Sequence, residues 1–124
     1  MELVFHVAAA VAAVIHVAFF AVESLLWGTN RINQRFRLTE EEARVLRPFA
    51  FNQGFYNLFL AIGVGVGLML GGVAGTTLLL FGCASMAGAG VVLFLSAKHL
   101  RVGAIVQLFF PAIALAGFGL SSIG

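Results

Sequence analysis

Long apolar runs alternate with short polar breaks along the whole chain of 124 residues. The runs extend over about 3–27, 51–70, 76–97 and 102–120, and each is close to the roughly 20 apolar residues that cross a bilayer as one helix. The breaks between them read "GTNRINQRFRL", "GGVAG" and "KHLR". This pattern predicts an all-α fold, a four-helix transmembrane bundle that forms a single integral membrane domain over 1–124.

The segment before the second span carries the signal of a short additional helix. Thr39 and Glu42 have the spacing of a capping box, in which each side chain accepts a hydrogen bond from the backbone N–H of the other residue. Pro48 is expected to end this helix, because proline lacks the N–H that a helix interior needs. We therefore predict a short cytoplasmic amphipathic helix between spans one and two. Pro111 is expected to kink the fourth span.

Glycine residues predict a turn and several close helix contacts. "GGVAG" is expected to form a tight turn, because glycine accepts the backbone angles that a short connection needs. Gly63, Gly67 and Gly71 recur every four residues, a spacing that lets helices approach closely in lipid. This glycine face either packs within the protein, contacts a second copy or has no special role. Gly54 is expected to allow a similar close approach.

Composition supports the membrane class. The chain is 61% apolar and 10% charged, with a mean hydropathy of +1.07, whereas an ordinary soluble domain carries about 25% charged residues. Cys83 is the single cysteine, so no intrachain disulfide is possible, and within an apolar run it is expected to pack as a small hydrophobe. No basic segment precedes the first apolar run, which is therefore expected to remain as a span rather than act as a signal peptide.

All the basic residues lie in or beside two of the three breaks, and four spans put these two on one side of the membrane. They are Arg31, Arg35, Arg37, Arg44, Arg47, Lys98 and Arg101. The positive-inside rule assigns this side to the cytoplasm and both termini to the outside. Basic residues in these positions set the topology of a membrane protein, and no stripe of basic and aromatic residues indicates a nucleic-acid partner.

Polar side chains from three spans are expected to meet at one depth near the cytoplasmic side. Glu23 lies near the end of the first span, and His16 lies almost two turns earlier on the same face, about 10 Å away along the helix axis. Trp27 continues this stripe, "NQGFYN" opens the second span, and Gln107 lies in the cytoplasmic third of the fourth span. Polar groups in hydrocarbon are costly unless they turn inward and find partners. The sequence therefore predicts a polar pocket that opens to the cytoplasm. Its predicted binding residues are His16, Glu23, Trp27, Asn52, Gln53, Tyr56, Asn57 and Gln107.

Several of these residues also have a simpler interpretation. Asn52 and Gln53 could be solvated at the headgroup boundary, and Trp27 and Tyr56 could be ordinary anchors at the membrane interface. Glu23 is harder to explain in this way, because a carboxyl group inside a membrane marks a functional site by default. Its alternative role is structural, as part of a hydrogen-bond network that joins spans one and two.

The sequence predicts neither a metal site nor a cofactor site. His16 and Glu23 alone fall short of the three or four ligands that zinc needs. The chain carries no HExxH, GxSxG, CxxC or phosphate-loop motif. We therefore expect no metal and no cofactor.

Four segments together resemble a known family. They are His16 and Glu23 with "LW" at 26–27, then "NQGFYNLFLAIG" at 52–63, "GCASMAGAG" at 82–90 and "QLFFPAIAL" at 107–115. These segments are similar to a bacterial family of small four-span membrane proteins of unknown function that carries an NQGxYNxFLA segment. The resemblance covers nearly the whole chain and implies a multi-pass protein of the inner (plasma) membrane. It implies no activity.

Three functions fit these observations. The first is a small transporter or channel for a solute or ion, in which Glu23 binds a proton or cation and the amides coordinate the solute. It would be a homo-oligomer, because four spans rarely enclose a pathway alone. The second is a structural or interaction subunit without transport, surrounded by the lipid bilayer. The third is a membrane-embedded enzyme acting on a lipophilic substrate, with His16 and Glu23 as its acid–base pair; the sequence favours the two hypotheses without catalysis.

Overall fold

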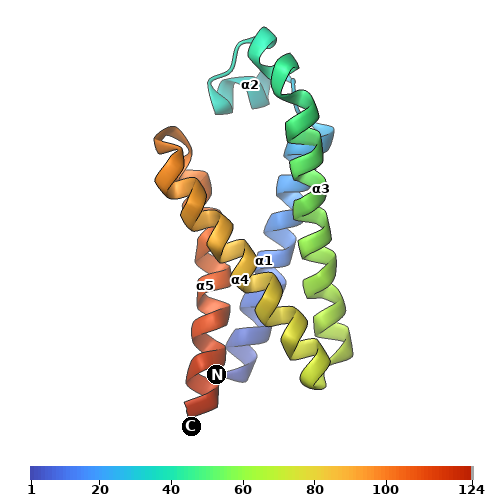
Figure 1. Ribbon diagram of the computed structural model, residues 1–124, viewed down its shortest axis with the longest axis vertical. Helices are drawn as coiled ribbons and strands as arrows, with labels where there is room; N and C mark the ends of the chain where they lie inside the picture. The colour runs from blue at the N-terminus through green and yellow to red at the C-terminus, as the bar shows by residue number, and fades with distance from the viewer. Residues whose placement is uncertain (124) are drawn as a thin grey trace.

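The computed structural model describes residues 1–123, and every regular element in that range is helical (Figure 1). The elements are α1 (Glu2–Phe20), the π-helical turn η1 (Ala21–Leu25), α2 (Asn30–Phe36), α3 (Glu40–Leu70), α4 (Gly72–Ser96), the 3-10 turn η2 (Lys98–Leu100) and α5 (Arg101–Ile123). Four of the helical segments are long and apolar enough to cross a membrane: α1 with η1, α3, α4, and η2 with α5. The predicted all-α fold with four membrane helices is confirmed.

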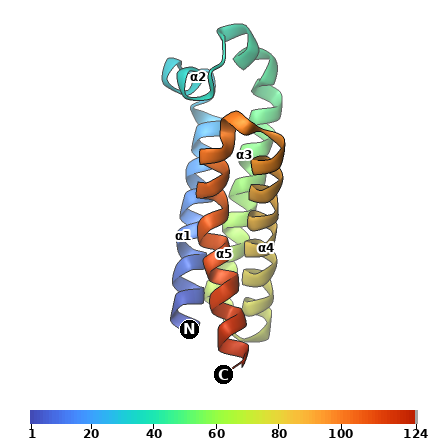
Figure 2. The same cartoon turned by 90° about the vertical axis from the view of Figure 1, so that its left-hand side faces the viewer.

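The four long helices form an antiparallel bundle (Figure 2). α1 packs mainly on α3 and α5, and α4 packs mainly on the same two helices. Both termini lie at one end of the bundle, whereas α2 and the α4–α5 connection lie at the other (Figures 1 and 2). We call these the terminal end and the basic end, because all the Lys and Arg residues belong to the connections at the second end or to the helix turns beside them.

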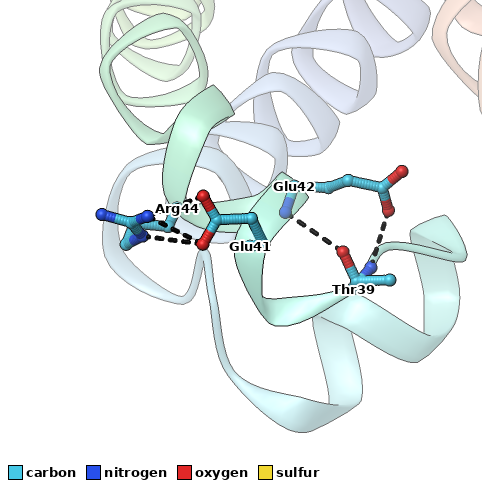
Figure 3. Close-up of polar contacts among 4 residues, drawn as sticks. All are labelled: Thr39, Glu41, Glu42 and Arg44. Carbon is cyan, nitrogen blue, oxygen red and sulfur yellow. Dashed lines mark hydrogen bonds and ion pairs between the residues drawn. The ribbon is translucent and has the colours of Figure 1, made fainter.

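The chain between the first two membrane helices differs from the prediction in one respect. A short helix is present, but it is α2, within "GTNRINQRFRL". The predicted capping box does form: the Thr39 hydroxyl accepts from the Glu42 N–H at 3.2 Å, and the Glu42 carboxylate accepts from the Thr39 N–H at 2.8 Å (Figure 3). The helix that it starts is α3, which continues through Pro48 to Leu70. The expectation that Pro48 ends a separate helix was wrong. Residues around Pro48 are exposed, so the Arg44 carbonyl that loses its helical donor is accessible to water.

The turn at the terminal end is shorter than "GGVAG" predicts. Only Gly71 separates α3 from α4, and Gly72 already begins the next helix. Their φ angles are +62° and +58°, in the left-handed region that glycine adopts without steric cost. α5 runs through the buried Pro111 as one continuous helix, and the kink predicted at this residue stays a prediction.

An apolar core fills the terminal half of the bundle. Its buried members are Phe5, Ala8, Ala9, Ala12, Val64, Leu79, Cys83, Met86 and Ala114. The backbones of α3 and α4 touch in this half, since a Cβ atom on Gly67 would lie 2.9 Å from the carbonyl oxygen of Gly75. Of the predicted glycine series, Gly67 makes this contact, whereas Gly63 and Gly71 face open space. Small residues thus allow the closest helix approach in the same half that holds the core.

Candidate functional site

In the basic half, the helices separate into two pairs. Gly54 joins α3 to the end of the first membrane helix, because a Cβ atom at this position would lie 3.1 Å from the backbone nitrogen of Ser24. Gly90 joins α4 to α5 in a similar way, since a Cβ atom added there would lie 3.0 Å from the Cβ atom of Leu108. α3 and α4 diverge towards the basic end, as Figure 1 shows. The close approach predicted at Gly54 is therefore present.

A cavity of about 580 Å³ lies between the two helix pairs. One wall comes from the end of the first membrane helix, the turn that follows it and α3, and consists of Glu23, Trp27, Ala50, Gln53 and Asn57. The facing wall comes from α4, η2 and α5, and consists of Ala89, Val92, Leu93, Ser96, Leu100 and Gln107. The side towards α2 is lined by Phe36, Leu46 and Phe49. Most of this lining is apolar, and its polar groups come from both walls.

Glu23 sits on the π-helical turn η1. The turn is wider than an α-helical turn: the Leu26 N–H donates to the carbonyl of Ala21, five residues earlier, at 2.9 Å. The Glu23 side chain is half-buried, and its Oε2 atom accepts a hydrogen bond from Nδ2 of Asn57 at 3.1 Å. Asn57 is only 4% exposed. Turns of this kind occur often at functional sites, and nothing in the sequence pattern predicted this one.

Three further hydrogen bonds hold this wall together. The Ser24 hydroxyl donates to the carbonyl of Phe51 at 2.8 Å, which ties η1 to α3. The Trp27 indole Nε1–H donates to the carbonyl of Ala43 at 2.9 Å. Arg47 donates to the backbone carbonyl of Trp27 at 3.2 Å. Because both its ring and its backbone are held, Trp27 occupies a fixed position on the cavity wall.

Five of the eight predicted binding residues line the cavity: Glu23, Trp27, Gln53, Asn57 and Gln107. Asn52 and Tyr56 do not, and both are exposed on another face of α3. Consecutive positions on a helix differ by about 100° in direction, and Gln53 rather than Asn52 is turned towards the cavity. That these five residues bind a solute stays a prediction.

His16 is also absent from the cavity wall. It is fully buried, with Nδ1 bonded to the carbonyl of Ala12 at 2.8 Å and with no protein hydrogen-bond partner for Nε2 among residues 1–123. The predicted shared face of His16 and Glu23 assumed a regular α-helix between them. The π-helical turn begins at Ala21 and changes the direction of the residues within it.

The apolar lining was not predicted, although part of it had a recognisable signal. Leu46, Ala50, Gln53 and Asn57 are spaced by three and four residues, which places them on one face of a helix. This stripe was hidden by the expectation that Pro48 interrupts the helix. The α4 residues of the facing wall have similar spacing, but in an apolar membrane helix their stripe looks the same as one that faces lipid.

A family model described as "Protein of unknown function (DUF1304)" matches residues 10–118. The match extends over most of the chain, from α1 to α5. The chain belongs to this family. All the cavity-lining residues, from Glu23 to Gln107, lie within the matched range of this DUF1304 protein. No curated protein and no solved structure gave a match.

The chemistry available in the cavity of the DUF1304 protein is limited to a few groups. Glu23 is the one ionisable side chain among the lining residues in the described part of the chain, and the other polar side chains are neutral amides, the Trp27 indole and the Ser96 hydroxyl. Within residues 1–123, no group of three or more His, Cys, Asp or Glu side chains is arranged to hold a metal ion. The arrangement suits recognition of a small molecule that is mostly apolar and carries a group that pairs with a carboxylate.

Proposed function

We propose that this DUF1304 protein is a small transporter of the bacterial inner (plasma) membrane, with its basic end in the cytoplasm and both termini outside. The cavity at the basic end is its solute site. The observation that carries the proposal is the cavity itself, with a volume of about 580 Å³, a largely apolar lining and a few polar groups. Binding pockets for small molecules typically have this size and this kind of lining.

The closed terminal half favours a transporter over a channel. Val64, Leu79 and Met86 are fully buried in the core, below the cavity on the terminal side. A solute in the cavity can therefore leave on the terminal side only after the helices rearrange. Rocking of one helix pair against the other, about the close contacts in the terminal half, is the kind of motion that gives alternating access.

The proposal includes the surroundings of the protein. The bilayer covers the exposed apolar side chains of the long helices, such as Phe59, Phe81 and Phe109. A homo-oligomer is part of the proposal as well, because four spans rarely enclose a pathway alone; the cavity residues named above all belong to one chain. The mass of the purified protein in nanodiscs tests the oligomeric state.

Cys83 provides a test of alternating access that needs no knowledge of the solute. It is the sole native cysteine and is fully buried. It also continues the stripe of α4 below the cavity: Ala89 leads to Met86 and then to Cys83 at three-residue steps. In vesicles of known orientation, a membrane-impermeant maleimide applied from the terminal side is expected to label Cys83 slowly.

The control for this experiment is Ser96→Cys in a Cys83→Ala background, which is expected to react rapidly from the basic side because Ser96 lines the cavity. A result with Ser96→Cys labelled and Cys83 unreactive from the terminal side contradicts the transporter. It would leave a binding protein with a fixed cavity.

A structural subunit is the second candidate function, and the hydrogen bonds of the cavity wall favour it. Asn57 to Glu23, Ser24 to Phe51 and Trp27 to Ala43 all join the end of the first membrane helix to α3. Such bonds stabilise helix packing in a membrane without any solute. The enzyme hypothesis has no comparable support, because an acid–base pair must reach one substrate together and His16 lies off the cavity wall.

A further inference from the structure

The geometry points to a hydrophobic organic cation as the solute: its ammonium group lies against the Glu23 carboxylate and the rings of Trp27, Phe36 and Phe49, and its apolar body lies against the aliphatic lining. This inference rests on the proposed role of the cavity as the solute site, and adds the chemical class that the cavity selects. Three observations carry it, namely the charge that the lining can carry, the lack of a cationic partner for Glu23 in the described chain, and the aromatic rings.

The one charge that the lining residues of the described chain can carry is negative. Glu23 is the one formally charged group among the lining residues of the described chain. Three arginines at the basic end are bonded elsewhere: Arg44 to Glu41 at 2.6 Å (Figure 3), Arg47 to the carbonyl of Trp27, and Arg101 to the carbonyl of Phe94. Arg35, Arg37 and Lys98 are close in sequence to lining residues but do not line the cavity themselves. Arg101 also stacks over the Phe94 ring. An anion would therefore find no cationic partner on the cavity wall.

Glu23 has no cationic partner among residues 1–123. Asn57 donates one hydrogen bond to Oε2, and this amide group is neutral. Within residues 1–123, the one salt bridge joins Arg44 to Glu41, so no side chain of the protein neutralises Glu23. A carboxylate within a membrane protein is costly without such a partner. A proton or a cationic solute can neutralise this carboxylate, whereas an uncharged lipophile cannot.

Aromatic rings complete the site. Trp27, Phe36 and Phe49 come from three different segments and all line the cavity. The rings of Trp27 and Phe36 lie 5.5 Å apart, tilted by 47°. Aromatic faces attract alkylated ammonium groups, and tryptophan does so most strongly. The remaining lining is mostly aliphatic, which suits the apolar body of such a cation.

Trp27 makes the proposal directly testable, because it is the only tryptophan in the chain and lines the cavity. The full-length protein in nanodiscs is titrated with benzyltrimethylammonium while Trp27 fluorescence is recorded. Two comparison probes are neopentylbenzene, in which carbon replaces the charged nitrogen, and the anion 4-tert-butylbenzoate. The cation is expected to give a saturable change at concentrations at least tenfold lower than either comparison probe.

The variant Glu23→Gln is expected to weaken binding of the cation at least tenfold, whereas the control Glu2→Gln, at the terminal end, leaves it unchanged. If Glu23→Gln fails to fold, Phe49→Leu takes its place, because Phe49 is an exposed lining residue. Phe49→Leu is expected to weaken binding of the cation several-fold and to leave the fluorescence signal of neopentylbenzene unchanged.

Equal affinity for the cation and its uncharged isostere overturns the inference, as does the lack of a saturable signal or an unchanged affinity in Glu23→Gln. These outcomes are separate from the test of transport. Selective cation binding with an unreactive Cys83 supports the solute class and refutes transport. A reactive Cys83 without cation selectivity supports transport and refutes the solute class.

Discussion

The two halves of the bundle use the same four helices in different ways. In the terminal half, α3 and α4 touch at Gly67 and Gly75, and apolar side chains fill the space between all four helices. In the basic half, Gly54 and Gly90 hold the helices together only in pairs, and polar groups line the cavity between the pairs. The close glycine contact between α3 and α4 thus lies in the half where the bundle is closed, and polar side chains are accommodated in the half where these helices separate.

An alanine-to-phenylalanine substitution in each half should give the largest difference in the free energy of unfolding. Ala12 is fully buried in the core, so Ala12→Phe overpacks it and is expected to lower the free energy of unfolding by about 3 kcal/mol. Ala89 lies on the cavity wall and is exposed, so Ala89→Phe should change it by less than about 0.5 kcal/mol. Thermal unfolding of both variants in the same detergent measures this, and equal losses would mean that the basic half is packed as tightly as the core.

Substitution of two glycines of α3 should show a smaller but still clear difference in stability. Gly67→Val places a branched side chain against the backbone of α4, and a loss of about 2 kcal/mol is expected. Gly63→Val is the matched control, because Gly63 lies one turn away and faces open space. A similar melting temperature for both variants would show that the approach of α3 and α4 does not depend on Gly67.

Asn57→Leu tests the polar wall of the basic half. It removes the donor to Glu23, and interhelical hydrogen bonds of this kind contribute about 1 kcal/mol in membranes. Asn52→Leu is the control, since Asn52 is exposed on another face of the same helix. The melting temperature should fall for Asn57→Leu only. An unchanged melting temperature for Asn57→Leu would argue against both the structural hydrogen-bond network and the position of Asn57 beside Glu23.

Trp27→Phe should have the smallest and most local effect. It removes the indole donor to the carbonyl of Ala43 while keeping an aromatic ring. The loss of one such bond, about 1 kcal/mol, corresponds to roughly a fivefold change in a local opening equilibrium. Hydrogen exchange of the amides in α2 and the first turns of α3 should accelerate by about this factor, while amides in the terminal half stay unchanged. Tyr56→Phe is the control, and uniform acceleration would show that Trp27 affects the whole bundle.

The sequence predicted the general fold well, because apolar runs of membrane length and basic breaks leave few alternatives. It also predicted the capping box at Thr39, which depends on neighbouring residues alone. Pro48 shows the limit of such rules: the lost hydrogen bond is tolerable in an exposed first part of a long helix, and exposure is a property of the folded chain.

The candidate site was predictable in part. The sequence predicted that Glu23, Asn57 and Gln107 lie close together, because the direction of each span places all three at one depth in the bundle. His16 could not be separated from Glu23 without knowledge of the π-helical turn, whose extra residue per turn has no sequence signature here. The apolar wall on α4 was also unpredictable, because facing a cavity and facing lipid require the same residue types.

The most direct test of the cavity in the basic half compares two positions on α4 in a Cys83→Ala background. Ala89 lines the cavity, whereas Val91 is exposed but lies outside it, and the two differ in depth by only about 3 Å. Spin labels at Ala89→Cys and Val91→Cys report collisions with a water-soluble nickel chelate and with oxygen dissolved in lipid. We predict nickel collisions at Ala89 and oxygen collisions at Val91. Oxygen collisions alone at both positions would contradict a cavity open to water at the basic end.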